Sequence, residues 1–250
     1  MRAGFIKKTC LIRQMFNNKA LDAKRGIKLP KNHSKELAEF FGILAGDGYI
    51  SFEKDRTQEI KISGHSIDDK DYHVNYICPL IKKLFGLLPK IRTVQGQKTR
   101  VVYIRSVSIN RFIRGTGYYK RNGKIKLPQW IFKEAYFYEF LRGLFDTDGS
   151  VAVKKKYRIK PYYPVLGITL KNKELISYIA YYLKKHGFKL WWGALNDFDT
   201  RTNKYYLRYR VQLSGFKQLA LWREKISFSN PKHLAKYDYV IKKKFGQKGI

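Results

Sequence analysis

Two aspartates, each followed by glycine, are the residues of this sequence best placed to do chemistry. Asp47-Gly48 ends the apolar run 36–48, and Asp148-Gly149 ends the similar run 138–149. Both runs resemble helices, and a carboxylate is disfavoured at the negative end of a helix dipole. Two such carboxylates that face each other repel further, so proteins keep them where a cation fills the gap. A hard ion such as Mg²⁺ fits best, and it implies phosphodiester hydrolysis by metal-activated water.

Small residues on the same two runs predict that the helices pack side by side. Gly42 and Gly143 hold matching positions in the two runs. Because small residues let helix backbones approach closely, a pseudo-twofold pair would bring the two aspartates together. The carbonyls of Gly46 and Thr147 are free at the helix ends and are candidate further metal ligands. The glycine after each aspartate is expected to be a left-handed helix cap.

The chain also repeats itself over most of its length. Lys-Leu-Pro at 28–30 recurs at 126–128, before each Asp-Gly run. After this run, the pattern of each half predicts two strands, a helix, two strands and a closing helix. The fold expected is therefore an α+β duplication. The strand-like stretches are 50–64, 90–94 and 100–110, and then 150–171, 189–195 and 204–213; the middle helices are Val74–Gly86 and Leu175–Gly187. The expected division is a basic N-terminal extension 1–29, repeat 30–118, linker 119–126 and repeat 127–245.

Charge narrows the class of partner. The chain has 52 Lys and Arg against 19 Asp and Glu, which gives a net charge of +33. This charge favours nucleic acid as the binding partner. The alternatives are association with the ribosome, attraction to a membrane surface, or a charge that serves solubility alone. Two cysteines cannot form a disulfide framework, so we expect them to be free thiols in a reducing compartment of the cell. The sequence does not indicate which compartment that is. No run is long enough to span a membrane. Residues 1–29 fit a basic extension better than a transit peptide.

Alternation along the strands predicts a cationic face that binds nucleic acid. Between 204 and 213 the polar side chains share one face, and Tyr205, Leu207, Tyr209, Val211 and Leu213 share the other. A β-ribbon is slim enough to enter the major groove, where Arg and Gln read base edges. The candidate contacts are Lys61, Arg100, Arg105, Lys154, Lys156, Arg158, Lys160, Lys204, Tyr206, Arg208, Arg210 and Gln212.

The runs 41–48 and 141–149 resemble the two signature motifs of LAGLIDADG homing endonucleases, in a single-chain member with two repeats. The resemblance covers about residues 28–245. It implies two αββαββα units whose motif helices form the interface and whose saddle-shaped antiparallel sheets sit on double-stranded DNA. It implies that Asp47 and Asp148 are the catalytic metal-binding acids, with Mg²⁺ as cofactor and Mn²⁺ or Ca²⁺ as substitutes. It also implies a monomer that cuts both strands and leaves 3′ overhangs.

The halves are not equal copies. The earlier acidic position of the motif is Asp146 in the second half and Ala45 in the first, so unequal strand rates are expected. Family members carry Lys, Arg or Gln near the metals. Lys171 and Lys232 are the candidates for this catalytic role, with Lys61 and Lys124 as weaker ones, and a surface or phosphate contact is an equal alternative for each. Gly64 aligns roughly with Lys171, so that role is not cleanly duplicated.

Three functions fit these patterns. The first is a site-specific DNA endonuclease that acts at a long non-palindromic target. The second is an RNA maturase on the same scaffold, with intron RNA as its partner. The third is a transcription regulator, which would need a helix-turn-helix that is not evident. Splicing activity is not expected, because no intein-type Cys or Ser begins the sequence and no His-Asn ends it.

Overall fold

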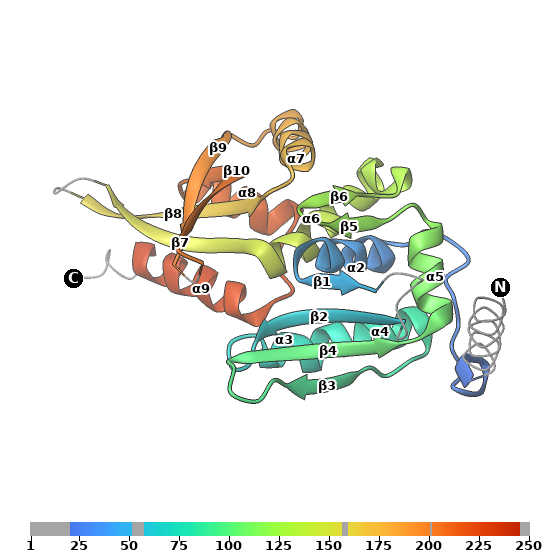
Figure 1. Ribbon diagram of the computed structural model, residues 1–250. Helices are drawn as coiled ribbons and strands as arrows, with labels where there is room; N and C mark the ends of the chain where they lie inside the picture. Colours follow the sequence, from blue (N-terminus) through green and yellow to red (C-terminus); the bar gives the residue numbers. More distant parts are fainter. Residues whose placement is uncertain (1–20, 52–57, 157–159, 201, 246–250) are drawn as a thin grey trace.

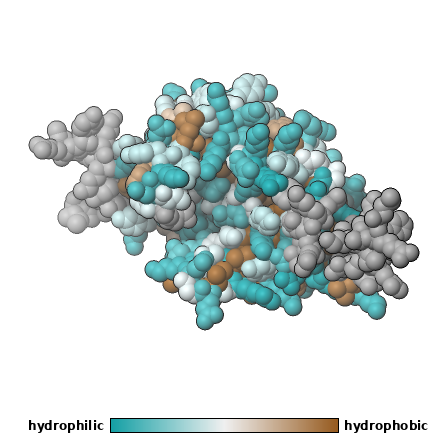
Figure 2. Space-filling view, viewed as in Figure 1, coloured by the Kyte–Doolittle hydropathy of each residue, from teal (hydrophilic) through white to brown (hydrophobic). Residues whose placement is uncertain are grey.

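The computed structural model describes residues 21–51, 58–156, 160–200 and 202–245. Two four-stranded antiparallel sheets flank a central pair of helices, α2 (Lys35–Gly46) and α6 (Glu134–Asp148) (Figure 1). The described surface is largely hydrophilic in the view of Figure 2, with its apolar residues in small groups, as the charge of +33 leads one to expect. No helix among the described residues is long and apolar enough to cross a membrane.

The first half follows the predicted order of elements around its sheet, whose strand order is β1-β2-β4-β3. Its middle helix is a continuous run that includes one π-helical turn, and Gly86 ends it with a left-handed φ of 69°. The elements after α2 are β1 (Gly48–Ile50), β2 (Glu59–His65), α3 (Lys70–Tyr72), η1 (His73–Ile77), α4 (Cys78–Phe85), β3 (Lys90–Thr93), β4 (Thr99–Arg105) and α5 (Val107–Gly115).

The second half repeats this topology with the strand order β7-β8-β10-β9. Its strands are longer, and one further helix follows the repeat. The elements are η2 (Gln129–Phe132), α6, β7 (Gly149–Lys156), β8 (Lys160–Leu170), α7 (Lys173–Lys185), β9 (Leu190–Asp199), β10 (Lys204–Ser214), α8 (Phe216–Lys225) and α9 (Pro231–Phe245). The predicted α+β fold of two αββαββα halves is therefore confirmed.

Local capping explains where several helices begin. The hydroxyls of Ser34 and Ser106 accept from backbone N–H groups in the first turns of α2 and α5, and the Asn172 side chain does the same for α7. Ser106 stops the strand predicted to run to 110, so the residues after it are helical instead. The buried Asp22 carboxylate adds a second acceptor at α5, because it binds the Ser108 N–H at 2.9 Å.

The close approach of α2 and α6 is confirmed. A Cβ at Gly42 would overlap the Phe140 carbonyl, and one at Gly143 would overlap the Glu39 carbonyl, so only glycine fits at this helix crossing. The prediction of left-handed caps after the aspartates is wrong. Gly149 is extended, with φ −83° and ψ 163°, and it begins a strand. Glycine is needed after both aspartates for space, because a Cβ at Gly48 or Gly149 would strike the last turn of the preceding helix.

Candidate functional site

The two motif aspartates lie together at the converging ends of α2 and α6. Asp47 follows the last residue of α2 and is half-buried, while Asp148 is the last residue of α6 and is exposed. Surrounding protein partly desolvates both groups. The pKa of Asp47 is raised to about 7, first by desolvation and then by the charges of Asp148 and Asp69, with Lys120 and Lys232 opposing the rise. Desolvation also raises the pKa of Asp148, against the charges of Lys120 and Arg208. Such mutual repulsion is what a shared cation would relieve.

The segment 119–126, predicted as a linker, brings a lysine to this pair. It forms a two-stranded hairpin of β5 (Tyr119–Arg121) and β6 (Lys124–Lys126) with an Asn122-Gly123 turn, in which both residues have positive φ. The Lys120 ammonium donates to the Gly46 carbonyl and, at 3.4 Å, to the Leu44 carbonyl. Desolvation lowers the pKa of Lys120, and both aspartates oppose this shift. An Asn-Gly pair is a strong hairpin signal, so the sequence could have revealed this arm.

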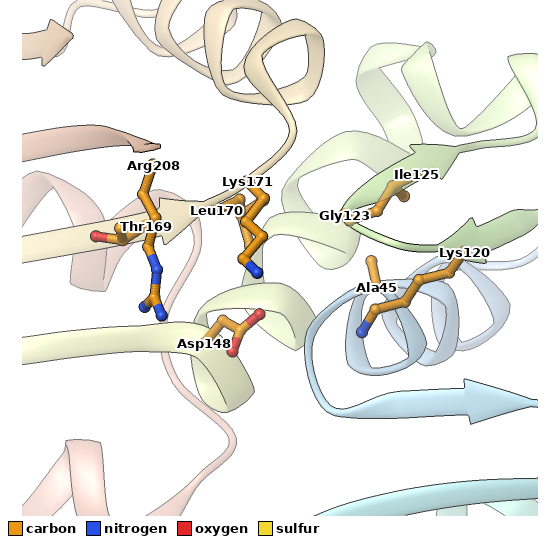
Figure 3. Close-up of a pocket in the computed structure, with 9 residues that line it drawn as sticks. All are labelled: Ala45, Lys120, Gly123, Ile125, Asp148, Thr169, Leu170, Lys171 and Arg208. Carbon is orange, nitrogen blue, oxygen red and sulfur yellow. The ribbon is translucent and has the colours of Figure 1, made fainter. Parts of the chain in front are cut away.

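A cavity of about 210 Å³ opens beside Asp148 (Figure 3). Lys171, a candidate from the sequence, lines this cavity, with its ammonium 4.5 Å from the centre of the Tyr206 ring. Arg208 points into the same space and pairs with Asp197 at 2.9 Å. The cavity is therefore cationic around a single carboxylate, which suits an anionic ligand. Its lining consists of Ala45, Lys120, Gly123, Ile125, Asp148, Thr169, Leu170, Lys171 and Arg208.

Strand register corrects the alignment of the halves. Gly48 pairs with Ile62, and Gly149 pairs with Ile168. Lys171 lies three residues after Ile168, and His65 lies three residues after Ile62. His65 is therefore the position equivalent to Lys171, and Gly64 is not. Gly64 instead leaves room for the His73 ring, which a Cβ would meet at 2.7 Å.

The Lys232 side chain belongs to the second half but pairs with a carboxylate of the first half. Its ammonium lies 2.7 Å from the Asp69 carboxylate, which also accepts from the Asn230 side chain at 3.1 Å. These bonds lower the pKa of Asp69, although burial opposes the shift. Lys232 still acts on Asp47 through charge. The candidate lysine thus lies near the acid pair but is engaged by a third carboxylate. Lys124 is exposed beside the turn of the β5–β6 hairpin.

The Ala45–Asp146 difference has a packing cause. The Asp146 side chain is fully buried and accepts from the Ser229 N–H at 2.7 Å, and Asn230 donates to its carbonyl at 3.0 Å. Asp146 thereby anchors the segment that carries Lys232 across to the first half. Ser229 also binds Glu39, which pairs with Arg142 at 2.7 Å. The equivalent Ala45 lines the cavity together with Lys120 and has no such bond to make.

The donor set at the acid pair fits a hard divalent cation. Two carboxylates and the Gly46 carbonyl are the oxygen ligands that Mg²⁺, Mn²⁺ and Ca²⁺ prefer. The described residues contain no cluster of three or more His, Cys, Asp or Glu that could hold a metal, so such an ion would need carbonyl, water or substrate oxygens as well. The Thr147 hydroxyl is turned back along α6, where it shares its one proton between the Gly143 and Leu144 carbonyls at 3.0 Å each.

The candidate DNA contacts of the first sheet are partly neutralised. Glu59 pairs with Lys61 at 2.9 Å and with Arg105 at 2.6 Å. Lys61 also lies 5.8 Å and 5.5 Å from the centres of the Tyr49 and Tyr103 rings. The Arg100 side chain donates to the Ser66 carbonyl at 3.2 Å.

The second sheet departs from the predicted alternation in two places. The strand register shifts between Lys154 and Lys156, and Lys156 pairs with Lys160. Arg158 lies outside the described residues. On β10 the predicted apolar face is buried only at Val211 and Leu213. Tyr205 and Leu207 are 72% and 56% exposed, because the first part of β10 extends beyond its pairing with β8.

The polar face of β10 changes character along the strand. Lys204 is exposed, whereas Tyr206, Arg208, Arg210 and Gln212 are half-buried. The Arg210 guanidinium packs against Gly167 of β8, where a Cβ would meet it at 2.6 Å. Lys204 is therefore the most accessible of the five side chains.

Comparisons with known proteins agree with this architecture. A family model described as a LAGLIDADG-like domain matches residues 138–191. The homing endonuclease I-DmoI, in a structure with DNA and Ca, matches 82% of this chain and 97% of its own at 19% identity and a TM-score of 0.54. A variant of I-SmaMI matches 85% of this chain and 91% of its own at 13% identity, with a TM-score of 0.53.

Two curated relatives come from Methanocaldococcus jannaschii. Its replication factor C small subunit is 26% identical over 212 residues, which are 84% of this chain and 10% of that protein. Its glutamine–fructose-6-phosphate aminotransferase is 21% identical over 224 residues, which are 88% of this chain and 19% of that protein. The chain spans less than a fifth of either relative. Residues 138–191 match a LAGLIDADG-like domain, and the chain shares its fold with I-DmoI and I-SmaMI.

Proposed function

We propose that this protein is a site-specific double-strand DNA endonuclease. The observation that carries the proposal is the pair Asp47 and Asp148, held together by two glycine-packed helices between two sheets with basic side chains. Nuclease folds of this kind support DNA cleavage, and the matched structure of I-DmoI contains DNA. Because one chain supplies both halves, the active form is a monomer. Unequal halves suit a long non-palindromic target.

Asp47 and Asp148 would hold the divalent ion, with the Gly46 and Thr147 carbonyls as further ligands. When bound, the ion supplies Lewis-acid chemistry and an acidified water. Mg²⁺ is the proposed cofactor; I-DmoI structures with Mn and with Ca support the use of divalent metal. Hydrolysis of one bond in each strand would leave 3′ overhangs, as the resemblance implies.

The remaining groups of the site act on the substrate phosphate. Lys171 and Arg208 present positive charge beside Asp148, where they would bind the phosphate and stabilise the charge that develops on it. Asp197 orients Arg208, and Tyr206 supports Lys171. Lys232, oriented by Asp69, would serve the first half in the same way. The sheets bind flanking DNA through Lys204 and neighbouring strand residues.

The test is cleavage of a randomised double-strand DNA library with Mg²⁺, compared with the same library in EDTA. We expect one enriched cut sequence for the parent protein and none for the Asp47→Asn, Asp148→Asn double variant. Equal cutting by both proteins would refute the proposal. The double variant also separates the maturase alternative, since assisting an intron RNA to splice would not need the two carboxylates.

A further inference from the structure

Lys120 donates to the Gly46 carbonyl next to Asp47, and the charges of both aspartates, the expected metal ligands, act on it. We propose that its ammonium is an internal counter-ion that holds the acid pair together in the metal-free protein. We further propose that it competes with a divalent cation for the Gly46 carbonyl. The inference rests on the proposed function, because it concerns how that same site accepts its metal.

The contacts of the ammonium are the first support. It donates to the carbonyls of Gly46 and Leu44 in the last turn of α2. That turn contains no basic residue whose side chain could bind these carbonyls instead. Gly46 directly precedes Asp47 in the sequence. An ion bound there would lie against the ammonium, and the two positive charges would repel.

The charge balance of the site is the second support. Both aspartates act on Lys120, which lines the same cavity as Asp148. Of the other cations near the pair, Arg208 pairs with Asp197 at 2.9 Å and Lys232 pairs with Asp69 at 2.7 Å. Lys171 lies over the Tyr206 ring, 4.5 Å from its centre. Among these cations, Lys120 lowers the pKa of both aspartates the most, so its ammonium is the main compensation for two carboxylates at two helix C-termini.

The β5–β6 hairpin fixes the backbone of Lys120 and leaves its side chain to move. The Asn172 side chain donates to the Ile125 carbonyl at 3.3 Å, and Ile125 is the cross-strand partner of Lys120. Gly123 packs directly on the Lys171 side chain. Because the hairpin is tied to the second half at these two points, the flexible four-carbon stem can release the ammonium without moving the strand. Once released, the ammonium is available to a DNA phosphate.

The experiment measures Mn²⁺ binding by calorimetry and thermal unfolding without DNA. It uses the full chain and the variants Lys120→Met and Lys120→Gln. We expect Mn²⁺ to bind roughly tenfold more tightly to both variants, since one repelling charge is lost. We also expect both to unfold at a lower temperature than the parent in EDTA, and to recover more of that stability when Mn²⁺ is added.

Lys126→Met is the matched control, because Lys126 is exposed on the same hairpin, and it should bind Mn²⁺ like the parent. Equal or weaker Mn²⁺ binding by both Lys120 variants would overturn the counter-ion inference and leave the proposed nuclease standing. If Lys120→Met does not fold, Lys120→Gln decides, since its amide can still donate to Gly46 without a charge. A parent that binds no Mn²⁺, with or without DNA, would overturn both proposals.

Discussion

The two halves of the molecule share a fold but differ in the chemistry beside their aspartates. In the second half, Lys171 and Arg208 present two cations next to Asp148. In the first half, the equivalent position to Lys171 is His65, whose cross-strand partner is Thr99. A third carboxylate, Asp69, lies there instead and is neutralised by Lys232 from the other half. The duplication therefore preserves the acids and their helices, while the charged groups beside the acids have diverged.

The two halves agree at the residues that determine how closely α2 and α6 cross. Gly42 and Gly143 each leave room for a carbonyl of the opposite helix. In each half, the segment that follows the repeat contacts the other half. The β5–β6 hairpin contacts the second half, and the segment Ser229–Lys232 contacts the first half. The comparison teaches that the candidate site is completed by both halves, which the following predictions test.

The largest expected effect is on cleavage. Because both acids serve one shared centre, Asp47→Asn and Asp148→Asn should each lower the rate of cutting for both strands by on the order of 10³-fold. Strand-specific labelling of a mapped target measures this. A single variant that cuts one strand at the parent rate would show that the halves act independently.

The next effect is on stability. Gly42→Ala and Gly143→Ala should each lower the free energy of unfolding by about 3 kcal/mol, because the added methyl meets backbone that cannot move aside. Urea denaturation measures the change. Gly115→Ala is the control, since a methyl group added there would meet nothing within 4 Å. Equal stability of all three variants would contradict the close helix crossing.

Two buried histidines predict acid sensitivity in both halves. Burial lowers the pKa of His73 to about 4 and that of His233 to about 3. Each contributes stability above the ordinary histidine pKa of about 6.5, and this stability is lost as pH falls toward the folded-state pKa. His233→Leu should therefore reduce the loss of unfolding free energy between pH 7 and pH 4 by about 2 kcal/mol. Urea denaturation at both pH values checks this, and an unchanged loss would argue against a neutral buried His233.

The divergence beside the aspartates predicts unequal kinetic effects. Lys171→Ala should lower kcat/KM by roughly tenfold, since its ammonium lies in the cavity beside Asp148. His65→Ala should change it by less than about threefold, because the His65 ring is turned toward Asp68 at 3.2 Å. Equal effects of the two variants would mean that the halves are functionally symmetric.

The smallest expected effect concerns the N-terminal segment. Asp22 caps α5 in the first half, whereas Gly215 begins α8 in the second half without a side-chain cap. Asp22→Ala should lower the free energy of unfolding by about 1 kcal/mol. Lys24→Ala, an exposed neighbour, should leave it unchanged. A loss of the same size in both variants would point to the segment as a whole and not to the cap.

Sequence patterns predicted the parts of the site that follow from repetition. The two aspartates, the paired glycines and the order of elements all recur at matched spacing, so they could be found by comparing the halves. Lys120 has no repeated counterpart, and only its Asn122-Gly123 turn hints at the hairpin that carries it. The partners of Lys232 and Asp146 depend on a segment that crosses between the halves, which no periodicity reveals.

The most direct test of the account is a crystal structure with the cleavage target and Mn²⁺, using anomalous scattering to locate the metal. We expect an anomalous peak in contact with carboxylate oxygens of both Asp47 and Asp148, with Lys120 withdrawn from Gly46. A peak bound elsewhere, for example at Asp69 or Asp197, or DNA bound in place with no metal at the two aspartates, would contradict the account.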